Sequence, residues 1–126
     1  MDTKETVLVV DDDREIVGAI ALALEKEGYR VLRAYDGMEA LDHALDPELR
    51  LILMDVMMPV MDGLTAAREI HATNRVGAAE IPIFAMTANA FYDDVRQSRE
   101  AGMVEHLSKP IQEQELLDAI RRHVKR

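Results

Sequence analysis

The residues able to do chemistry in this sequence stand directly after short apolar segments. These residues carry carboxylate, hydroxyl or ammonium groups, and they are Asp11, Asp12, Asp13, Asp55, Thr87 and Lys109. In an open α/β sheet, ligands bind beyond the carboxyl ends of the strands. Carboxylates that converge there repel each other unless a cation neutralises them. An oxygen ligand set without His or Cys suits Mg²⁺, so we predict a magnesium site at this edge.

A metal, a hydroxyl and an ammonium group around one carboxylate also suit a phosphoryl group. Phosphoryl chemistry depends mainly on positioning and on neutralising charge. For residues 11–13 taken alone, the alternative is a strand-end turn in which Asp13 caps the next helix. The shared site is favoured because Asp55, Thr87 and Lys109 fall at three other strand ends.

The period of the apolar residues predicts the elements that position these groups. Strands are expected at residues 7–10, 29–34, 51–54, 81–86 and 103–107. Helices are expected at residues 16–24, 38–45, 64–72, 91–101 and 116–124, with a polar loop at 74–80. Gly28 and Gly102 stand where two of these helices should end. Strands that alternate with helices predict a parallel sheet with helices on both faces.

Length and composition restrict the class of protein. The 126 residues suit one compact domain, and the absence of cysteine excludes disulfides and thiolate chemistry. The net charge of −9 lies entirely in residues 1–63, which argues against direct nucleic-acid binding. No apolar run is long enough for a bilayer, and the polar N-terminus does not resemble a signal peptide. We therefore expect a cytoplasmic domain without a membrane partner.

Four stretches of the chain resemble the receiver domain of two-component response regulators. They are residues 7–13 (VLVVDDD), 51–63 (LILMDVMMPVMDG), 85–88 (AMTA) and 108–110 (SKP). The resemblance spans essentially the whole chain, and the D-x-x-M-P-x-x-D-G stretch is highly specific. It implies a flavodoxin-like (βα)5 fold, doubly wound, with strand order 2-1-3-4-5 and helices on both faces. We therefore expect a single receiver domain over residues 1–126.

The resemblance also implies a role for each acidic residue. Asp55 is expected to accept a phosphoryl group from a phosphohistidine, and it must be ionised to act as the nucleophile. Asp12 is expected to ligate Mg²⁺ directly, and Asp11 through a water molecule. Asp55 and the backbone carbonyl of Met57 complete the protein ligands that the family implies.

The remaining implied roles concern the other strand ends. Lys109 is expected to pair with the phosphoryl oxygens, and Thr87 to hydrogen-bond one of them after transfer. The family also implies a cis peptide between Lys109 and Pro110, a bond type in which cis is accessible. In the family, an aromatic switch residue three positions before the lysine turns inward upon phosphorylation.

This chain departs from the family pattern at that position, which is His106. A neutral imidazole tolerates burial, whereas its charged form does not unless a carboxylate pairs with it. Glu105 points to the opposite face of the strand and is not a natural partner. We therefore expect acid to disfavour an inward His106. The alternative is a solvent-facing histidine on an edge strand.

Several other residues receive structural interpretations. Met54, Met57, Met58 and Met61 are expected to pack around the site loop. The remaining histidines, which are His43, His71 and His123, are expected on the surface. The basic residues at the end of the chain are expected to stabilise a helix C-terminus.

Two rival functions fit the sequence less well. A haloacid-dehalogenase-like phosphatase also uses an aspartyl phosphate, and residues 11–13 contain a D-x-D. The expected hydroxyl residue is missing after them, and the chain is short for that class. A flavodoxin-like cofactor carrier needs a phosphate-binding loop where this chain has three carboxylates. A receiver without phosphorylation chemistry is a third alternative, although every chemical residue is present.

We therefore expect a phosphorylation-activated switch that catalyses its own phosphotransfer and autodephosphorylation but acts in signalling. Its partners would be a sensor histidine kinase or histidine phosphotransfer domain and a downstream output protein or domain. The output surface would be the fourth helix, fifth strand and fifth helix. Met57 cannot orient a water and Asn89 cannot act as a base, so we expect slow autodephosphorylation. The sequence suits either a stand-alone regulator or a receiver within a larger protein.

Overall fold

The computed structural model describes residues 5–58, 61–73, 77–87 and 92–124. The strands are β1 (Thr6–Val10), β2 (Arg30–Ala34), β3 (Leu49–Asp55), β4 (Ile83–Thr87) and β5 (Glu105–Ser108). The helices are α1 (Arg14–Lys26), α2 (Gly37–His43), α3 (Gly63–His71), α4 (Tyr92–Glu100) and α5 (Glu113–His123), with a 3₁₀ turn η1 (Ala78–Glu80). Strands and helices alternate along the chain, as the apolar pattern predicts.

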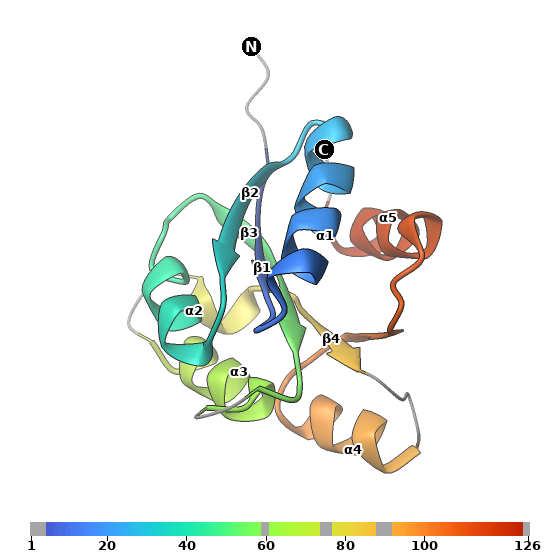
Figure 1. Ribbon diagram of the computed structural model, residues 1–126. Coiled ribbons are helices and arrows are strands. Elements are labelled where there is room, and N and C mark those ends of the chain that lie inside the picture. The colour runs from blue at the N-terminus through green and yellow to red at the C-terminus, as the bar shows by residue number, and fades with distance from the viewer. Residues whose placement is uncertain (1–4, 59–60, 74–76, 88–91, 125–126) are drawn as a thin grey trace.

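The strands form one parallel sheet in the order β2-β1-β3-β4-β5 (Figure 1). This order confirms the predicted doubly wound, flavodoxin-like fold. β1 and β3 lie side by side in the interior of the sheet, and β5 forms one edge. The carboxyl ends of β1, β3, β4 and β5 therefore meet at one edge, where the sequence places its chemical residues.

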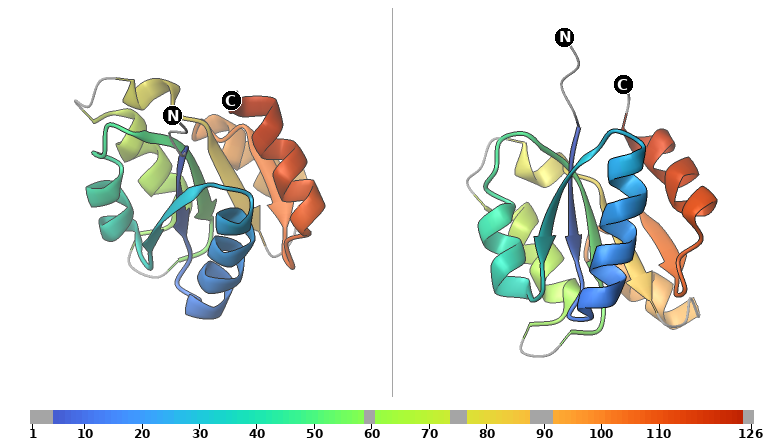
Figure 2. Two further views of the ribbon diagram at one scale, coloured as in Figure 1. Left: turned by 90° about the horizontal axis from the view of Figure 1, so that it is seen from above. Right: turned by 45° about the horizontal axis from the view of Figure 1, so that its top comes forward.

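Helices cover both faces of the sheet (Figure 2). On one face α1 and α5 pack on an apolar cluster that includes Leu24, Leu53, Phe84, Leu107 and Ile120. On the other face α2 and α3 pack on a cluster that includes Leu8, Ala40, Ile52, Ile70 and Ala85. β1 and β3 are almost entirely buried because both of their faces meet a helix layer.

The helix ends follow the predicted signals. Asp13 caps α1, because its Oδ1 accepts hydrogen bonds from the amides of Glu15 and Ile16 at 3.0 and 3.4 Å. Gly28 and Gly102 follow α1 and α4 with φ of 93°, a conformation that favours glycine. The last turn of α5 is basic. Its buried residues Leu116, Leu117 and Ile120 belong to the core, as does Val124 directly after the helix.

The strand bounds differ from the predicted ones by one or two residues, and two of these differences have an identifiable reason. β3 extends to Asp55, so the acidic residue is the last residue of the strand rather than the first residue after it. β4 begins at Ile83, since Pro82 has no N–H for the ladder; its carbonyl accepts from the amide of Ile52 at 3.0 Å. Within the predicted loop at 74–80, residues 78–80 form η1. In the described part of the chain, no helix has the length and apolar character needed to span a membrane.

Candidate functional site

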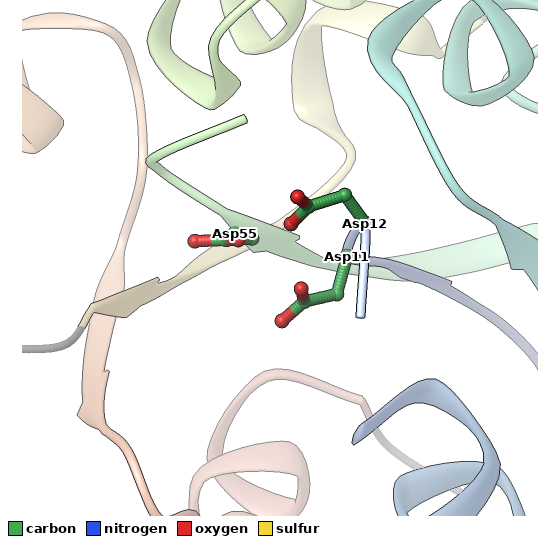
Figure 3. A group of neighbouring side chains, drawn as sticks. All are labelled: Asp11, Asp12 and Asp55. Atoms are coloured by element: carbon green, nitrogen blue, oxygen red, sulfur yellow. The ribbon is translucent and has the colours of Figure 1, made fainter. Parts of the chain in front are cut away.

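Three carboxylates meet beyond β1 and β3. Asp11 follows β1 and is anchored by its amide, which donates to the carbonyl of Ala34 at 3.2 Å. Asp55 ends β3, and both side chains are buried, whereas Asp12 is exposed. Figure 3 shows the three side chains converging from the two strand ends. One oxygen from each lies within 4.8 Å of the others, which is a spacing that a single cation can bridge.

Lys109 reaches this group from the loop after β5. Its Nζ lies 2.7 Å from Oδ2 of Asp11 and 3.3 Å from Oδ2 of Asp55. The backbone holds it there, because the Lys109 amide donates to the carbonyl of Thr87 at 2.7 Å. The peptide between Lys109 and Pro110 is cis, as the resemblance implies. We call Asp11, Asp12, Asp55 and Lys109 the acidic site.

Burial and like charge determine the electrostatics of the acidic site. Burial raises the pKa of Asp55 from 3.8 to about 6, and the charge of Asp11 adds to the rise. The Met57 amide and the Lys109 ammonium oppose it. Burial alone would lower the pKa of Lys109, but its contacts with Asp11 and Asp55 raise it above the ordinary value. One ammonium against three carboxylates leaves the site short of positive charge.

The turn after β3 fixes the Asp55 carboxylate. The amide of Met57 donates to Oδ1 of Asp55 at 3.1 Å, which leaves Oδ2 directed toward Lys109. Gly63 opens α3 behind the turn, and its amide donates to the carbonyl of Val56 at 3.0 Å. A side chain at Gly63 would collide with the backbone carbonyl of Asp55. Gly63 is the last residue of the D-x-x-M-P-x-x-D-G stretch, so the motif itself signals this close approach of the backbone, which the sequence analysis did not predict.

The methionine prediction is correct for three residues and wrong for one. Met54 and Met58 are buried, and Met61 packs against the same core cluster. Met57 is 78 % exposed and packs against none of it. Its backbone is held by the hydrogen bond to Asp55, so its side chain projects to solvent beside the acidic site. Pro59 and Val60 of the motif lie outside the described residues, as do Ala88 and Asn89.

Thr87 and His106 lie on neighbouring strands near the acidic site. Thr87 ends β4 and is 4 % exposed. His106 is half-buried, and its ring atom Nε2 is buried, so the tip of the ring does not face solvent. Burial lowers the pKa of His106, Arg99 lowers it further, and Glu105 acts in the opposite direction. The prediction that Glu105 is not the ion-pair partner of His106 is confirmed, because the Glu105 carboxylate pairs with Arg122 and His123 of α5.

The prediction of surface histidines is wrong for the two that the packing engages. Nε2 of His71 lies 3.0 Å from the carbonyl of Ile81, and its ring blocks any side chain at Gly102. Nε2 of His123 lies 2.9 Å from Oε2 of Glu105, and its ring meets Phe84 edge to face at 5.3 Å. His43 is half-buried at the end of α2. These contacts join segments far apart in sequence, which no local pattern reports.

The acidic site fits a divalent cation. Asp11 and Asp55 are two buried carboxylates whose repulsion a cation would relieve. The donor set is made of oxygen, the type that Mg²⁺ prefers. Asp12 is exposed, so its carboxylate could bind a metal ion without first being buried.

The comparisons with known proteins agree with this geometry. The response regulator receiver domain family matches residues 7–121. The transcriptional regulatory protein CpxR of Escherichia coli K12 is 36 % identical over 120 residues, which are 95 % of this chain and 49 % of the relative. This chain thus belongs to the response regulator receiver domain family. It spans about half the length of this curated relative.

Solved receiver structures have the same fold. The chemotaxis protein CheY4 of Vibrio cholerae superposes with a TM-score of 0.90 at 29 % identity, covering 97 % of this chain and all of that one. The receiver domain of the sensor histidine kinase PA1611 of Pseudomonas aeruginosa has a TM-score of 0.86 at 36 % identity, with 96 % and 98 % covered. That structure holds a magnesium ion in its active-site cleft. Membership of this family implies signalling that depends on phosphorylation, and it favours the receiver prediction over the phosphatase alternative.

Proposed function

We propose that Asp55 accepts a phosphoryl group from the phosphohistidine of a sensor histidine kinase or a histidine phosphotransfer domain. In this step an Asp55 oxygen forms a bond to phosphorus while the bond from phosphorus to the imidazole nitrogen breaks. The observation that carries the proposal is the position of Asp55, a buried carboxylate with Lys109 at 3.3 Å and two further carboxylates beside it. The repulsion between these carboxylates is only partly offset by Lys109, so the arrangement suits a site that binds positive charge.

Asp11, Asp12, Asp55 and the backbone carbonyl of Met57 would hold Mg²⁺, with Asp11 acting through a water. When bound, the ion supplies positive charge against the phosphoryl oxygens and the carboxylates. Lys109 pairs with the phosphoryl oxygens from the other side and helps to keep Asp55 ionised. The pKa of about 6 leaves most Asp55 side chains ionised at neutral pH and therefore nucleophilic.

The protein catalyses its own phosphotransfer and autodephosphorylation, and its role is that of a switch. Thr87 donates to a phosphoryl oxygen after transfer, and His106 responds on the neighbouring strand. The surface of α4, β5 and α5 then changes its affinity for the output partner. Hydrolysis is slow because the bulky apolar side chain of Met57, exposed beside the acidic site, cannot orient a water and would shield an attached phosphoryl group.

The relatives support two kinds of output. CpxR is a transcriptional regulator, whereas the PA1611 receiver belongs to a sensor kinase. This receiver would act on an attached or separate output partner. The net charge of −9 argues against direct binding of nucleic acid by this domain.

The phosphoryl acceptor is tested by mass spectrometry after incubation with acetyl phosphate and Mg²⁺. The wild-type protein should gain one phosphoryl group, and Asp55→Asn should gain none. Asp118→Asn, which changes an exposed carboxylate on α5, is the matched control and should behave like the wild type. Labelling of Asp55→Asn at the wild-type rate would show that another residue is the acceptor.

A further inference from the structure

The sulfur of this chain lies entirely in its eight methionines, and those of the described residues differ widely in exposure. Met54, Met86 and Met103 have at most 2 % of their surface exposed, whereas Met57 is 78 % exposed. Met38 on α2 follows at 57 %. An oxidant reaches an exposed thioether directly, but it reaches a buried one only after the fold opens locally. Met57 therefore has the most accessible oxidisable sulfur in the described part of the chain.

The position of Met57 connects this sulfur to the acceptor carboxylate. Met57 lies two residues after Asp55, and its amide donates to Oδ1 of Asp55 at 3.1 Å. That hydrogen bond uses only the backbone of Met57, so a chemical change at the sulfur leaves it in place. Among the described residues, neither apolar cluster of the core includes the Met57 side chain. Oxidation at this position therefore alters the surroundings of Asp55 while the core stays packed.

Oxidation also changes how the Met57 side chain interacts with water. A thioether sulfur is a weak hydrogen-bond acceptor, so it does not hold a water molecule in a fixed orientation. A sulfoxide is polar, and its oxygen carries partial negative charge and accepts hydrogen bonds. The methionine side chain is unbranched with three rotatable bonds, so this oxygen is free to move over the turn beside Asp55. The modification thus replaces an apolar shield with a group that binds water.

We propose that Met57 is a site of reversible oxidation by peroxides, and that its sulfoxide shortens the lifetime of a phosphoryl group on Asp55. The sulfur attacks one oxygen of hydrogen peroxide, the O–O bond breaks, and the second oxygen leaves as water. The sulfur is oxidised by two electrons and the peroxide is reduced by two. A thiol-dependent methionine sulfoxide reductase reverses the change, because two thiols become a disulfide and the sulfoxide oxygen leaves as water.

The second half of the proposal rests on the proposed function and concerns hydrolysis. A water that donates to the sulfoxide oxygen attacks phosphorus, and the bond from phosphorus to the Asp55 oxygen breaks. Phosphate leaves, one proton passes to solvent, and the Asp55 carboxylate is restored. The sulfoxide takes no proton and only orients the water, so Met57 is a positioning residue. We expect label loss to become about fivefold faster, the effect of one hydrogen bond of ordinary strength.

The oxidation site is tested by tandem mass spectrometry of peptides after treatment with hydrogen peroxide. Met57 should gain one oxygen well before Met54, whose buried sulfur lies three residues earlier on β3 and serves as an internal reference. A methionine sulfoxide reductase should remove that oxygen from the folded protein. Oxidation of Met57 no faster than that of Met54 would overturn the assignment of the site.

The effect on hydrolysis is tested by the decay of protein phosphorylated with acetyl phosphate and Mg²⁺ after the peroxide has been removed. Prior oxidation should quicken the decay in the wild type and in Met38→Leu, which lacks the other exposed thioether. Met57→Leu should decay at its own rate with or without peroxide. Met57→Gln carries an amide oxygen and should decay quickly without any oxidation. Treatment with the reductase should restore the slow decay of the wild type.

The outcomes separate this proposal from the proposed function. An unchanged decay rate in protein whose Met57 is fully oxidised would refute the effect on hydrolysis. Equal acceleration of Met57→Leu by peroxide would also refute it, because the cause would then be another residue. Failure of the untreated wild type to take up a phosphoryl group contradicts the proposed function instead, while the peptide analysis still decides whether Met57 is the oxidation site.

Discussion

Two groups of polar and charged side chains lie at opposite ends of β5, and they differ in burial, in the balance of charge and in the direction of their pKa shifts. At its start, Glu105 is held by Arg122 and His123 of α5; we call these three residues the Glu105 cluster. Beyond its end, Lys109 enters the acidic site. Both groups contain carboxylates near cations. The hydrogen bonds from Arg122 lower the pKa of Glu105, whereas burial raises that of Asp55.

The difference lies in burial and in the balance of charge. The side chain of Arg122 is 56 % exposed, so the Glu105 cluster keeps much of its hydration and gains from pairing. Asp11 and Asp55 have almost no exposure, and one ammonium serves them both. The Glu105 cluster is electrostatically satisfied by its own residues and fastens α5 to β5. The acidic site has more negative than positive charge among its own residues, so a ligand that brings positive charge would stabilise it.

The largest expected difference concerns stability against pH in the metal-free protein. Because the pKa of Asp55 is raised from 3.8 to about 6, the native state holds a proton between these values that the unfolded chain has lost. Stability from this group therefore falls as pH rises through that window, by about 3 kcal/mol in total. Asp55→Asn should be more stable than the wild type at pH 7.5, by about 10 °C in melting temperature. The two proteins should converge near pH 4.

Glu105→Gln supplies the contrasting control for that experiment. The lowered pKa of Glu105 means that its ionised form stabilises the fold above its ordinary pKa of 4.5 and that this contribution is lost in acid. The variant should therefore be less stable than the wild type at neutral pH, which is the opposite sign from Asp55→Asn. Thermal melts across the pH range check both. Equal pH profiles for Asp55→Asn and the wild type would contradict the raised pKa of Asp55.

The next effect is stabilisation by Mg²⁺, which the contrast assigns to the acidic site alone. At ten times its dissociation constant, a ligand stabilises the native state by about 1.4 kcal/mol, or about 5 °C for a domain of this size. Asp12→Ala should lose most of this shift, because it removes a proposed ligand that is not needed for packing. Glu105→Gln should keep all of it. A wild-type melting temperature that does not change in millimolar Mg²⁺ would count against the metal site.

A smaller effect is expected at the rim of the acidic site. Met57→Asn replaces an exposed apolar side chain by one that can orient water toward the phosphoryl group. Phosphorylated protein should lose its label about fivefold faster, which corresponds to about 1 kcal/mol in the barrier. Leu22→Asn is a control on α1 with a side chain that is also exposed. Decay of phosphorylated Met57→Asn at or below the wild-type rate would refute the proposed shielding.

The smallest effect should come from the Glu105 cluster. At neutral pH, Glu105→Gln is expected to lower the melting temperature by about 3 °C, since exposed ion pairs contribute little. Its rate of phosphorylation by acetyl phosphate should equal that of the wild type. A large change in that rate would mean that the Glu105 cluster and the acidic site influence each other, and the two groups could then not be compared as independent.

The sequence alone determined the element order, the parallel sheet and the members of the acidic site. It did so because these are local properties: apolar periodicity identifies each strand, and the carboxyl ends of parallel strands meet at one edge. Asp11, Asp55, Thr87 and Lys109 could therefore be predicted to meet. The family resemblance then supplied their roles.

Only the tertiary structure decided how each group is paired and buried. It placed Lys109 nearer to Asp11 than to Asp55, turned Met57 to solvent, and engaged His123 with Glu105. It also buried the tip of the His106 ring instead of exposing it on the edge strand. Such contacts join residues that are distant in the chain, and their geometry follows from how the helices pack on the sheet. Burial, which sets the pKa of Asp55, is likewise a property of the packed fold rather than of any segment.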